Sequence, residues 1–164
     1  MRISIALILG LLLAACGFQL RGTAALPFDT LYMPSTAAGV ALDLKRNIQS
    51  GTRTMVVDDP KKAAAVLDFL EEVRERNILS LGATGRVREY QLRYRVSFRV
   101  HDGKGGEFLP ANTVQLTRDI SFDDTDVLAK ETEEQQLYRD MQFDMVQQIM
   151  RRLTAAHPAA PAVQ

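Results

Sequence analysis

The 164-residue sequence predicts an α+β domain in two layers: a mostly antiparallel sheet with two helices packed on one face. Two observations support this prediction. Residues 90–100 alternate between apolar and polar side chains, which is typical of a half-buried strand. Apolar residues also recur with the period of an α-helix over 37–48 and again over 137–153. The length suits one domain, and a sheet with one apolar face needs a helical layer to cover it.

The composition excludes several classes of function. Twenty basic residues balance 20 acidic ones, so no net charge attracts the chain to nucleic acid, and we expect no nucleic-acid partner. Cys16 is the only cysteine, which rules out an internal disulfide. His101 and His157 are too few and too far apart to suggest a zinc or haem site. We therefore expect no metal and no cofactor.

The first residues resemble the signal peptide of a bacterial lipoprotein. After Met1 and Arg2, the apolar run Ile3–Leu13 is too short to span a bilayer but suits a signal-peptide core. The small residues that follow lead into Cys16, as in a lipobox. This pattern predicts a signal peptide over 1–15 and acyl chains on Cys16, which give stable anchoring when several are present. Gly17 stands where inner-membrane lipoproteins carry Asp, so the pattern indicates the outer membrane.

A short strand and a helix are expected next, after a lipidated linker over 16–27. Residues 30–33 form a short apolar stretch, read as a strand. Ser35 or Thr36 can cap a helix that ends at Gly51. The apolar positions of this helix follow the 3.6-residue period: Ala37, Val40, Ala41, Leu44 and Ile48.

The segment 63–81 is ambiguous from its own residues. Its apolar positions fit a helical stripe slightly better than strand alternation. The clear strand over 90–100 needs a partner, however, and the turn over 82–85 lets residues 65–81 fold back onto it as a hairpin. Residues 55–57 are expected to add only a short extended piece.

The second half of the chain predicts another strand and a long helix. A turn over 102–106 precedes alternation over 113–122, which indicates a third long strand. Asp123, Asp124 or Thr125 can then cap the helix that carries the second apolar stripe. We expect the folded domain to cover 28–155 and the tail over 156–164 to be disordered.

Three segments together resemble the LptE family of LPS-assembly lipoproteins. They are the residues from Cys16 to Gly22, Arg88–Leu92 in the central strand, and Val127–Glu131 at the start of the last helix. The resemblance implies a four-stranded sheet with two helices, which makes residues 63–81 a strand. It also implies a one-to-one complex with the outer-membrane β-barrel LptD. There the lipoprotein acts as a plug and assembly factor, held at the inner leaflet by its acyl chains, and binds lipopolysaccharide on its way to the outer leaflet.

The resemblance implies three candidate residues for contact with lipopolysaccharide. Lys130 matches a lysine that the family associates with this binding. The family's best-studied members also carry a basic residue at the hairpin tip, where this chain has the residues 82–85 without a cation. Arg86 and Arg88 are the nearest cations and take that place as candidates. Guanidinium groups bind phosphate through paired donors, which suits the phosphates of lipid A.

Three further arginines leave two interpretations open. Arg93, Arg95 and Arg99 share one face of the central strand, beside a single acid, Glu89, between 84 and 101. They could contact lipopolysaccharide, or they could form the ordinary solvated face of a sheet. Lys130 lies among acidic residues and, without the resemblance, would fit a helix-surface ion pair.

Two other classes of function would each need features of their own. A hydrolase would need a nucleophile and base, but the chain has no G-x-S-x-G elbow and no glycine-rich loop between a strand and a helix, so we expect no enzyme. A lipoprotein that binds a small ligand or peptidoglycan would need a concave apolar pocket and no barrel partner.

Overall fold

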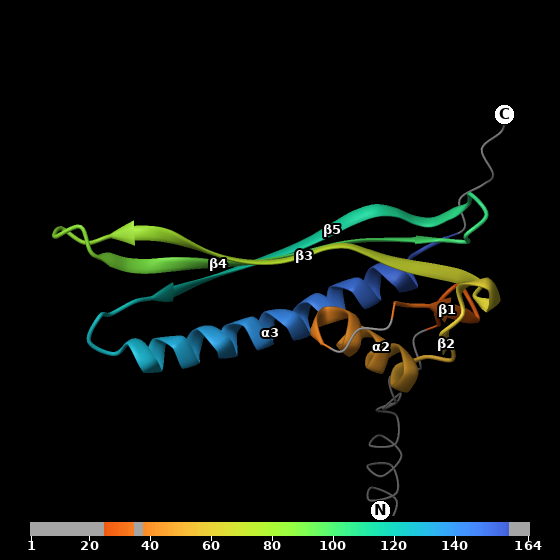
Figure 1. The fold of residues 1–164 in the computed structure, drawn as a ribbon, viewed down its shortest axis with the longest axis horizontal. Helices are drawn as coiled ribbons and strands as arrows, with labels where there is room; N and C mark the ends of the chain where they lie inside the picture. Colours follow the sequence, from red (N-terminus) through yellow and green to blue (C-terminus); the bar gives the residue numbers. More distant parts are fainter. Residues whose placement is uncertain (1–24, 35–37, 158–164) are drawn as a thin grey trace, which may run out of the picture.

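The computed structural model describes residues 25–34 and 38–157 as one mixed sheet covered by two α-helices (Figure 1). The elements in chain order are β1 (Thr30–Tyr32), α2 (Gly39–Gly51), β2 (Met55–Val57), the 3-10 helix η1 (Pro60–Lys62), β3 (Ala65–Leu81), β4 (Val87–His101), β5 (Glu107–Ser121) and α3 (Val127–Thr154). Both α-helices lie on the same side of the sheet. The α+β prediction with two helices on one face is confirmed.

The sheet differs from the prediction in strand number and direction. It has five strands in the order β2-β1-β3-β4-β5, whereas four mostly antiparallel strands were expected. The additional strand is β2, whose residues were expected to be only an extended piece. It pairs in parallel with β1, as Thr30 opposite Met55. The direction follows from the connection, because α2 forms a crossover between the two strands.

The hairpin prediction for residues 65–81 is confirmed over the full length of β3. β3 runs antiparallel to β4 from Val66, opposite His101, to Leu81, opposite Val87. Gly85 has φ +78° in the connecting turn, a conformation that glycine adopts without strain. On its other edge β3 pairs with β1 only at Ala65 and Val66. Beyond Val66 this edge has no strand neighbour in the described part of the chain.

Both helices follow the predicted apolar stripes, but the start of the long one differs from the prediction. The N-cap of α3 is Asp126. Asp123 instead accepts hydrogen bonds from the backbone N–H (2.9 Å) and hydroxyl (2.8 Å) of Thr125, so it stabilises the turn before the helix. These bonds hold the pKa of the Asp123 carboxyl below its ordinary value. The suggested caps Ser35 and Thr36 lie outside the described residues, as do residues 158–164 of the expected tail.

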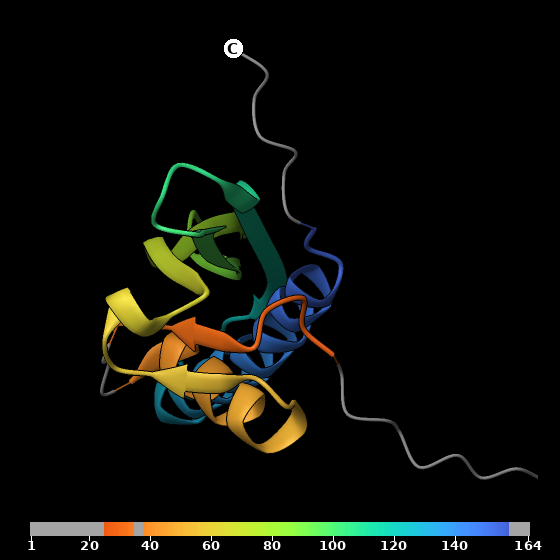
Figure 2. The same ribbon diagram turned by 90° about the vertical axis from the view of Figure 1, so that its right-hand side faces the viewer.

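The hydrophobic core is concentrated at the end of the molecule that holds β1, β2 and α2. The apolar face of β4 is fully buried there, and the end-on view shows the strands arching over the helices (Figure 2). The buried residues of α3 begin only at Met141. The first half of α3 and the far part of the β3–β4 hairpin therefore extend beyond the core as a narrow arm (Figure 1). In the described residues, neither helix is long and apolar enough to cross a membrane.

Candidate functional site

The end of the narrow arm contains an open groove, which we call the tip groove. Its volume is about 770 Å³. It lies between the end of the β3–β4 hairpin, the end of β5 and the first turn of α3. The lining residues are Ser80, Leu81, Arg88, Glu89, Ser121, Phe122, Asp123 and Lys130. Two of the three cations predicted from the sequence, Arg88 and Lys130, thus line one groove although 42 positions separate them in the chain.

Lys130 is held in place by neighbours on two elements. Its Nζ donates to Ser121 Oγ at 3.0 Å and pairs with Glu133 Oε2 at 2.8 Å, one helical turn further on. Only 21% of the side chain is exposed. The ammonium group therefore has a fixed position at the wall of the groove, and its third donor remains for a ligand. The Lys130–Glu133 pair is also the helix-surface ion pair that the residues alone predict for this lysine.

Arg88 and Arg86 differ in their surroundings. Arg88 is exposed and forms no ion pair with any described residue, while its backbone carbonyl accepts from Phe122 N–H at 2.7 Å and ties the hairpin to the end of β5. Arg86 lies beside the turn, where its Nη1 is 3.7 Å from Asp124 Oδ2. Arg86 is not among the groove-lining residues. Of the two, Arg88 is better placed to bind an anion in the groove.

The other three arginines of β4 are paired with acids on β3. Arg99 bonds to Asp68 at 2.9 Å, Arg95 to Glu71 at 3.2 Å and Arg93 to Glu75 at 3.5 Å. These pairs form a cross-strand ladder on the sheet face away from the helices. The ladder neutralises most of the positive charge that the sequence shows on this strand, so the arrangement favours the solvated-face interpretation for these residues.

A polar network on the helix-facing side of β3 connects the arm to the core. Tyr94 donates its hydroxyl hydrogen to Glu72, and Arg74 donates to the Tyr94 oxygen at 3.0 Å and to Gln142 Oε1 at 2.6 Å. Gln142 in turn donates to Asp43 Oδ2 on α2 at 2.6 Å. Burial and the Glu72 carboxylate raise the pKa of Tyr94. The network joins β3, β4, α2 and α3. The sequence did not predict this network. Charged residues in this segment look like the solvated face of a helix, although in the structure they lie on a strand and face the core.

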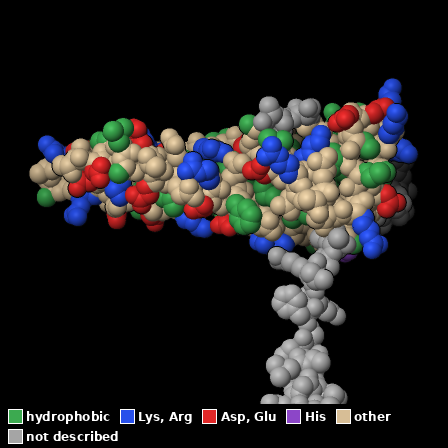
Figure 3. All heavy atoms as spheres, turned by 90° about the horizontal axis from the view of Figure 1, so that it is seen from below, with side chains coloured by type: hydrophobic (Ala, Val, Ile, Leu, Met, Phe, Trp, Pro, Cys, Tyr) green, Lys and Arg blue, Asp and Glu red, His purple; other side chains and the backbone are tan. Residues whose placement is uncertain are grey.

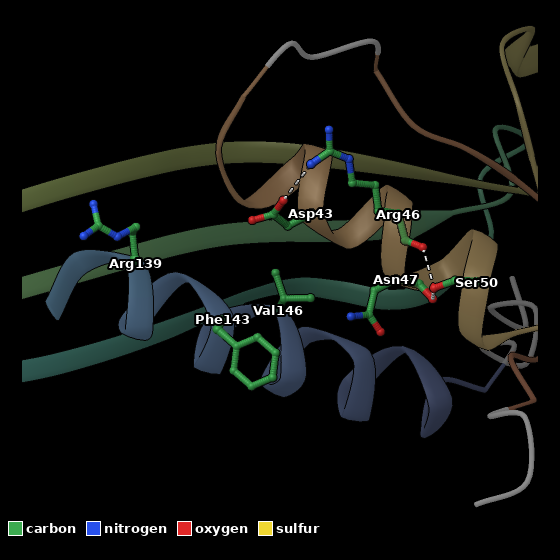
Figure 4. Close-up of a pocket in the computed structure, with 7 residues that line it drawn as sticks. All are labelled: Asp43, Arg46, Asn47, Ser50, Arg139, Phe143 and Val146. Atoms are coloured by element: carbon green, nitrogen blue, oxygen red, sulfur yellow. Dashed lines mark hydrogen bonds and ion pairs between the residues drawn. The ribbon is translucent and has the colours of Figure 1, made fainter. Parts of the chain in front are cut away.

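A second, smaller groove lies between the two helices, away from the arm (Figure 4). Its volume is about 280 Å³. Phe143 stands out because 64% of it is exposed, which the sequence pattern did not indicate. The lining residues are Asp43, Arg46, Asn47, Ser50, Arg139, Phe143 and Val146. Neither groove is lined mainly by apolar side chains, so neither matches the concave apolar pocket that a small-ligand lipoprotein would need.

Comparisons with known proteins agree with the fold. Residues 28–153 match the sequence profile of the family described as LptE, lipopolysaccharide-assembly. An LPS-assembly lipoprotein LptE from Yersinia enterocolitica is 30% identical over 153 residues, covering 91% of this chain and 73% of that protein. One from Photorhabdus laumondii is 26% identical and covers 91% and 82%.

Solved structures similar to this chain include two from other bacteria. The solution structure of an uncharacterised lipoprotein B from Nitrosomonas europaea has a TM-score of 0.73 and 42% identity, covering 85% of this chain and 91% of that one. The crystal structure of the rare lipoprotein B from Shewanella oneidensis has a TM-score of 0.66 and 26% identity, covering 77% and 94%. The profile match and these relatives together show that the chain belongs to the LptE family of lipopolysaccharide-assembly lipoproteins.

Proposed function

We propose that this lipoprotein is a subunit of the translocon that delivers lipopolysaccharide to the outer leaflet of the outer membrane. Acyl chains on Cys16 anchor it to the inner leaflet. The domain occupies the lumen of the β-barrel LptD in a one-to-one complex, where it acts as plug and assembly factor. Arg88 and Lys130, with Arg86 beside them, bind the phosphates of lipopolysaccharide in transit. The function is binding and assembly, with no catalytic step.

The convergence of Arg88 and Lys130 in the tip groove is the observation that supports the binding role. A guanidinium and an ammonium group on two different elements suit a ligand that carries more than one phosphate. The groove is also large enough for a sugar phosphate and is lined mostly by polar side chains. Family membership supports the assembly role, since the relatives are named as LPS-assembly lipoproteins.

The barrel partnership is tested by purifying the tagged, natively anchored protein from detergent-solubilised outer membranes. We expect LptD to come with it in stoichiometric amount. A matched control is an unrelated outer-membrane lipoprotein with the same tag, which should recover no LptD. If this protein comes alone while other barrel complexes survive the same detergent, the translocon assignment is wrong and the small-ligand alternative becomes the better one.

A further inference from the structure

The groove between the two helices has an apolar wall and a polar wall (Figure 4). Phe143 and Val146 of α3 form the apolar wall. Among the large hydrophobic side chains that are exposed in the described part of the chain, Phe143 is the only aromatic one. Hydrophobic side chains are visible between charged ones on this side of the molecule (Figure 3). A ring that is 64% exposed in a groove has apolar area that a bound segment can cover.

The polar wall, on α2, offers hydrogen bonds and little net charge. Asp43 lies 3.7 Å from Arg46 and offsets it, which leaves Arg139 as the only charged residue of the groove lining without an ion pair in the described part of the chain. No hydrogen bond of the Asn47 side chain is found among the described residues, so its amide can pair with the backbone of an extended chain. An uncharged segment with apolar side chains therefore suits this groove.

The residues just after Cys16 are such a segment. Gly17–Leu20 is uncharged and carries two large apolar side chains, Phe18 and Leu20, which lie on the same face when the chain is extended. A plain flexible tether would instead be rich in glycine and serine. At the other end of the chain, residues 158–164 have no aromatic residue and are mostly alanine and proline, so they fit the exposed ring less well.

The chain enters the domain beside the end of α2, close to the groove. Phe28 O accepts a hydrogen bond from Thr54 Oγ1 at 2.9 Å, and Thr54 follows the groove residue Ser50 by four positions. Four residues of extended chain span at most about 14 Å, whereas the eight from Leu20 to Phe28 span up to about 28 Å. Leu20 is therefore within reach of Ser50, and Phe18 within reach of the groove beyond it.

We infer that Phe18 and Leu20 dock in the groove between α2 and α3, with the Phe18 ring against Phe143. Both docking residues lie outside the described part of the chain. The inference goes beyond the proposed function, since it concerns how the domain is held relative to its anchor and uses no contact with lipopolysaccharide. Docking places Cys16 two residues from the bound Phe18, so the acyl chains proposed for it leave the domain beside the two helices.

The test measures disulfide formation in the full, anchored protein, in which acylation leaves no thiol on Cys16. Gln19 lies on the opposite face of the extended segment from its two apolar neighbours and so faces the polar wall, and Gln19→Cys is combined with Asn47→Cys. The matched control combines it with Gln49→Cys, an exposed position of the same helix that does not line the groove. After oxidation of isolated membranes, a maleimide reagent that shifts the protein on a gel counts the remaining thiols.

We expect the Asn47 pair to close at least about tenfold faster than the Gln49 pair, because docking raises the effective concentration of its two thiols. Phe143→Ala removes the ring against which Phe18 packs and should make the two rates similar. The Phe143 side chain is mostly exposed, so we expect this variant to fold. Leu128→Ala, at an exposed position of α3 outside the groove, should keep the difference.

Similar rates for the two pairs without the Phe143 substitution would show that the segment moves freely past α2, and the inference would be wrong. A rate difference that Phe143→Ala leaves unchanged, or disulfides that join two copies of the chain, would overturn it as well. Recovery of LptD is measured on the same membranes, so a failure of the proposed function is seen separately.

Discussion

Lys130 lies in the first turn of α3, where the helix dipole disfavours a cation. Glu133 and Ser121 compensate by holding the ammonium group at the groove wall. Pairing with Glu133 lowers the net charge available to a ligand but orders the side chain, so less entropy is lost on binding. The structural pairing and the proposed ligand contact are therefore compatible at this residue.

Charge reversal at Lys130 is expected to weaken lipopolysaccharide binding. Lys130→Glu places a carboxylate beside Glu133, repels phosphate and removes a charge-assisted hydrogen bond, so affinity should fall about tenfold or more. Lys104→Glu, in the exposed β4–β5 turn, is the matched control and should leave binding unchanged. Binding of purified lipopolysaccharide measures both variants. Equal affinity of Lys130→Glu and the unmodified protein would contradict the assigned role.

The hydrogen bonds of the Tyr94 hydroxyl are expected to stabilise the fold. Tyr94→Phe removes the hydroxyl that links Glu72 with Arg74, and we expect a loss of about 1–3 kcal/mol in the free energy of unfolding. Tyr90→Phe is the control, since no hydrogen bond of its hydroxyl is found among the described residues and it should change stability little. Urea unfolding with an unchanged slope measures the difference. A Tyr94→Phe protein as stable as the parent would show that the network does not stabilise the arm.

At the scale of elements, β3 shows why sequence patterns were informative for some strands and ambiguous for others. Between Tyr90 and Val100 no residue of β4 is skipped in its pairing with β3, so the alternation can be read directly; the one skipped residue of β4, Arg88, lies near the turn. In β3 the pairing slips at Leu70 and again at Leu79, and each slip moves the following side chains to the opposite face. Charged residues such as Arg74 also face the helices, where the polar network satisfies them. Two arguments favoured a strand over residues 65–81. The strand that follows needs a partner, and the family resemblance implies a strand there.

Short elements and caps were harder to predict for a different reason. Three residues, as in β2, are too few to show a period, so the fifth strand became evident only from its pairing with β1. Several acidic and hydroxyl residues precede α3, and each could serve as its N-cap. In the structure the N-cap is Asp126. Arg88 and Lys130 meet because of the length of the hairpin and the turn between β5 and α3. The residues alone do not predict this meeting; only the family resemblance indicated both as candidates.

The two halves of α3 should respond differently to the loss of an apolar side chain. Ile149→Ala leaves a cavity beneath the sheet and should cost about 2–5 kcal/mol of stability. Leu128, 79% exposed at the other end of the helix, should change stability by less than about 0.5 kcal/mol when replaced by Ala. Urea unfolding of the two variants gives the comparison. Similar losses at both positions would mean that the first half of α3 packs as tightly as the second.

The whole molecule combines a core end and a projecting arm, and each has its own task in the proposed function. The core buries the apolar faces of α2, of the second half of α3 and of the part of the sheet above them. The arm holds the tip groove. In the proposed function, acyl chains on Cys16 hold the chain near its N-terminus, and the arm meets the ligand.

Removal of the lipidation site should separate folding from anchoring. A Cys16→Ala protein exported without acyl chains is expected to be monomeric and soluble, because its helices and strands each have only one apolar face. Gel filtration and circular dichroism of the periplasmic fraction measure this. Aggregation of an exported, correctly processed Cys16→Ala protein would show that the acyl chains or the barrel are needed to cover its surface.

Delivery of lipopolysaccharide to the cell surface after depletion of this protein tests the central claim most directly. Newly made lipopolysaccharide on the outer leaflet is labelled in living cells that carry, in place of the natural copy, the natural chain, Lys104→Glu, or the double variant Arg88→Glu and Lys130→Glu. The account predicts normal surface labelling with the first two, and a loss of surface labelling both in depleted cells and with the double variant at equal protein level. Normal surface delivery in fully depleted cells would contradict the account.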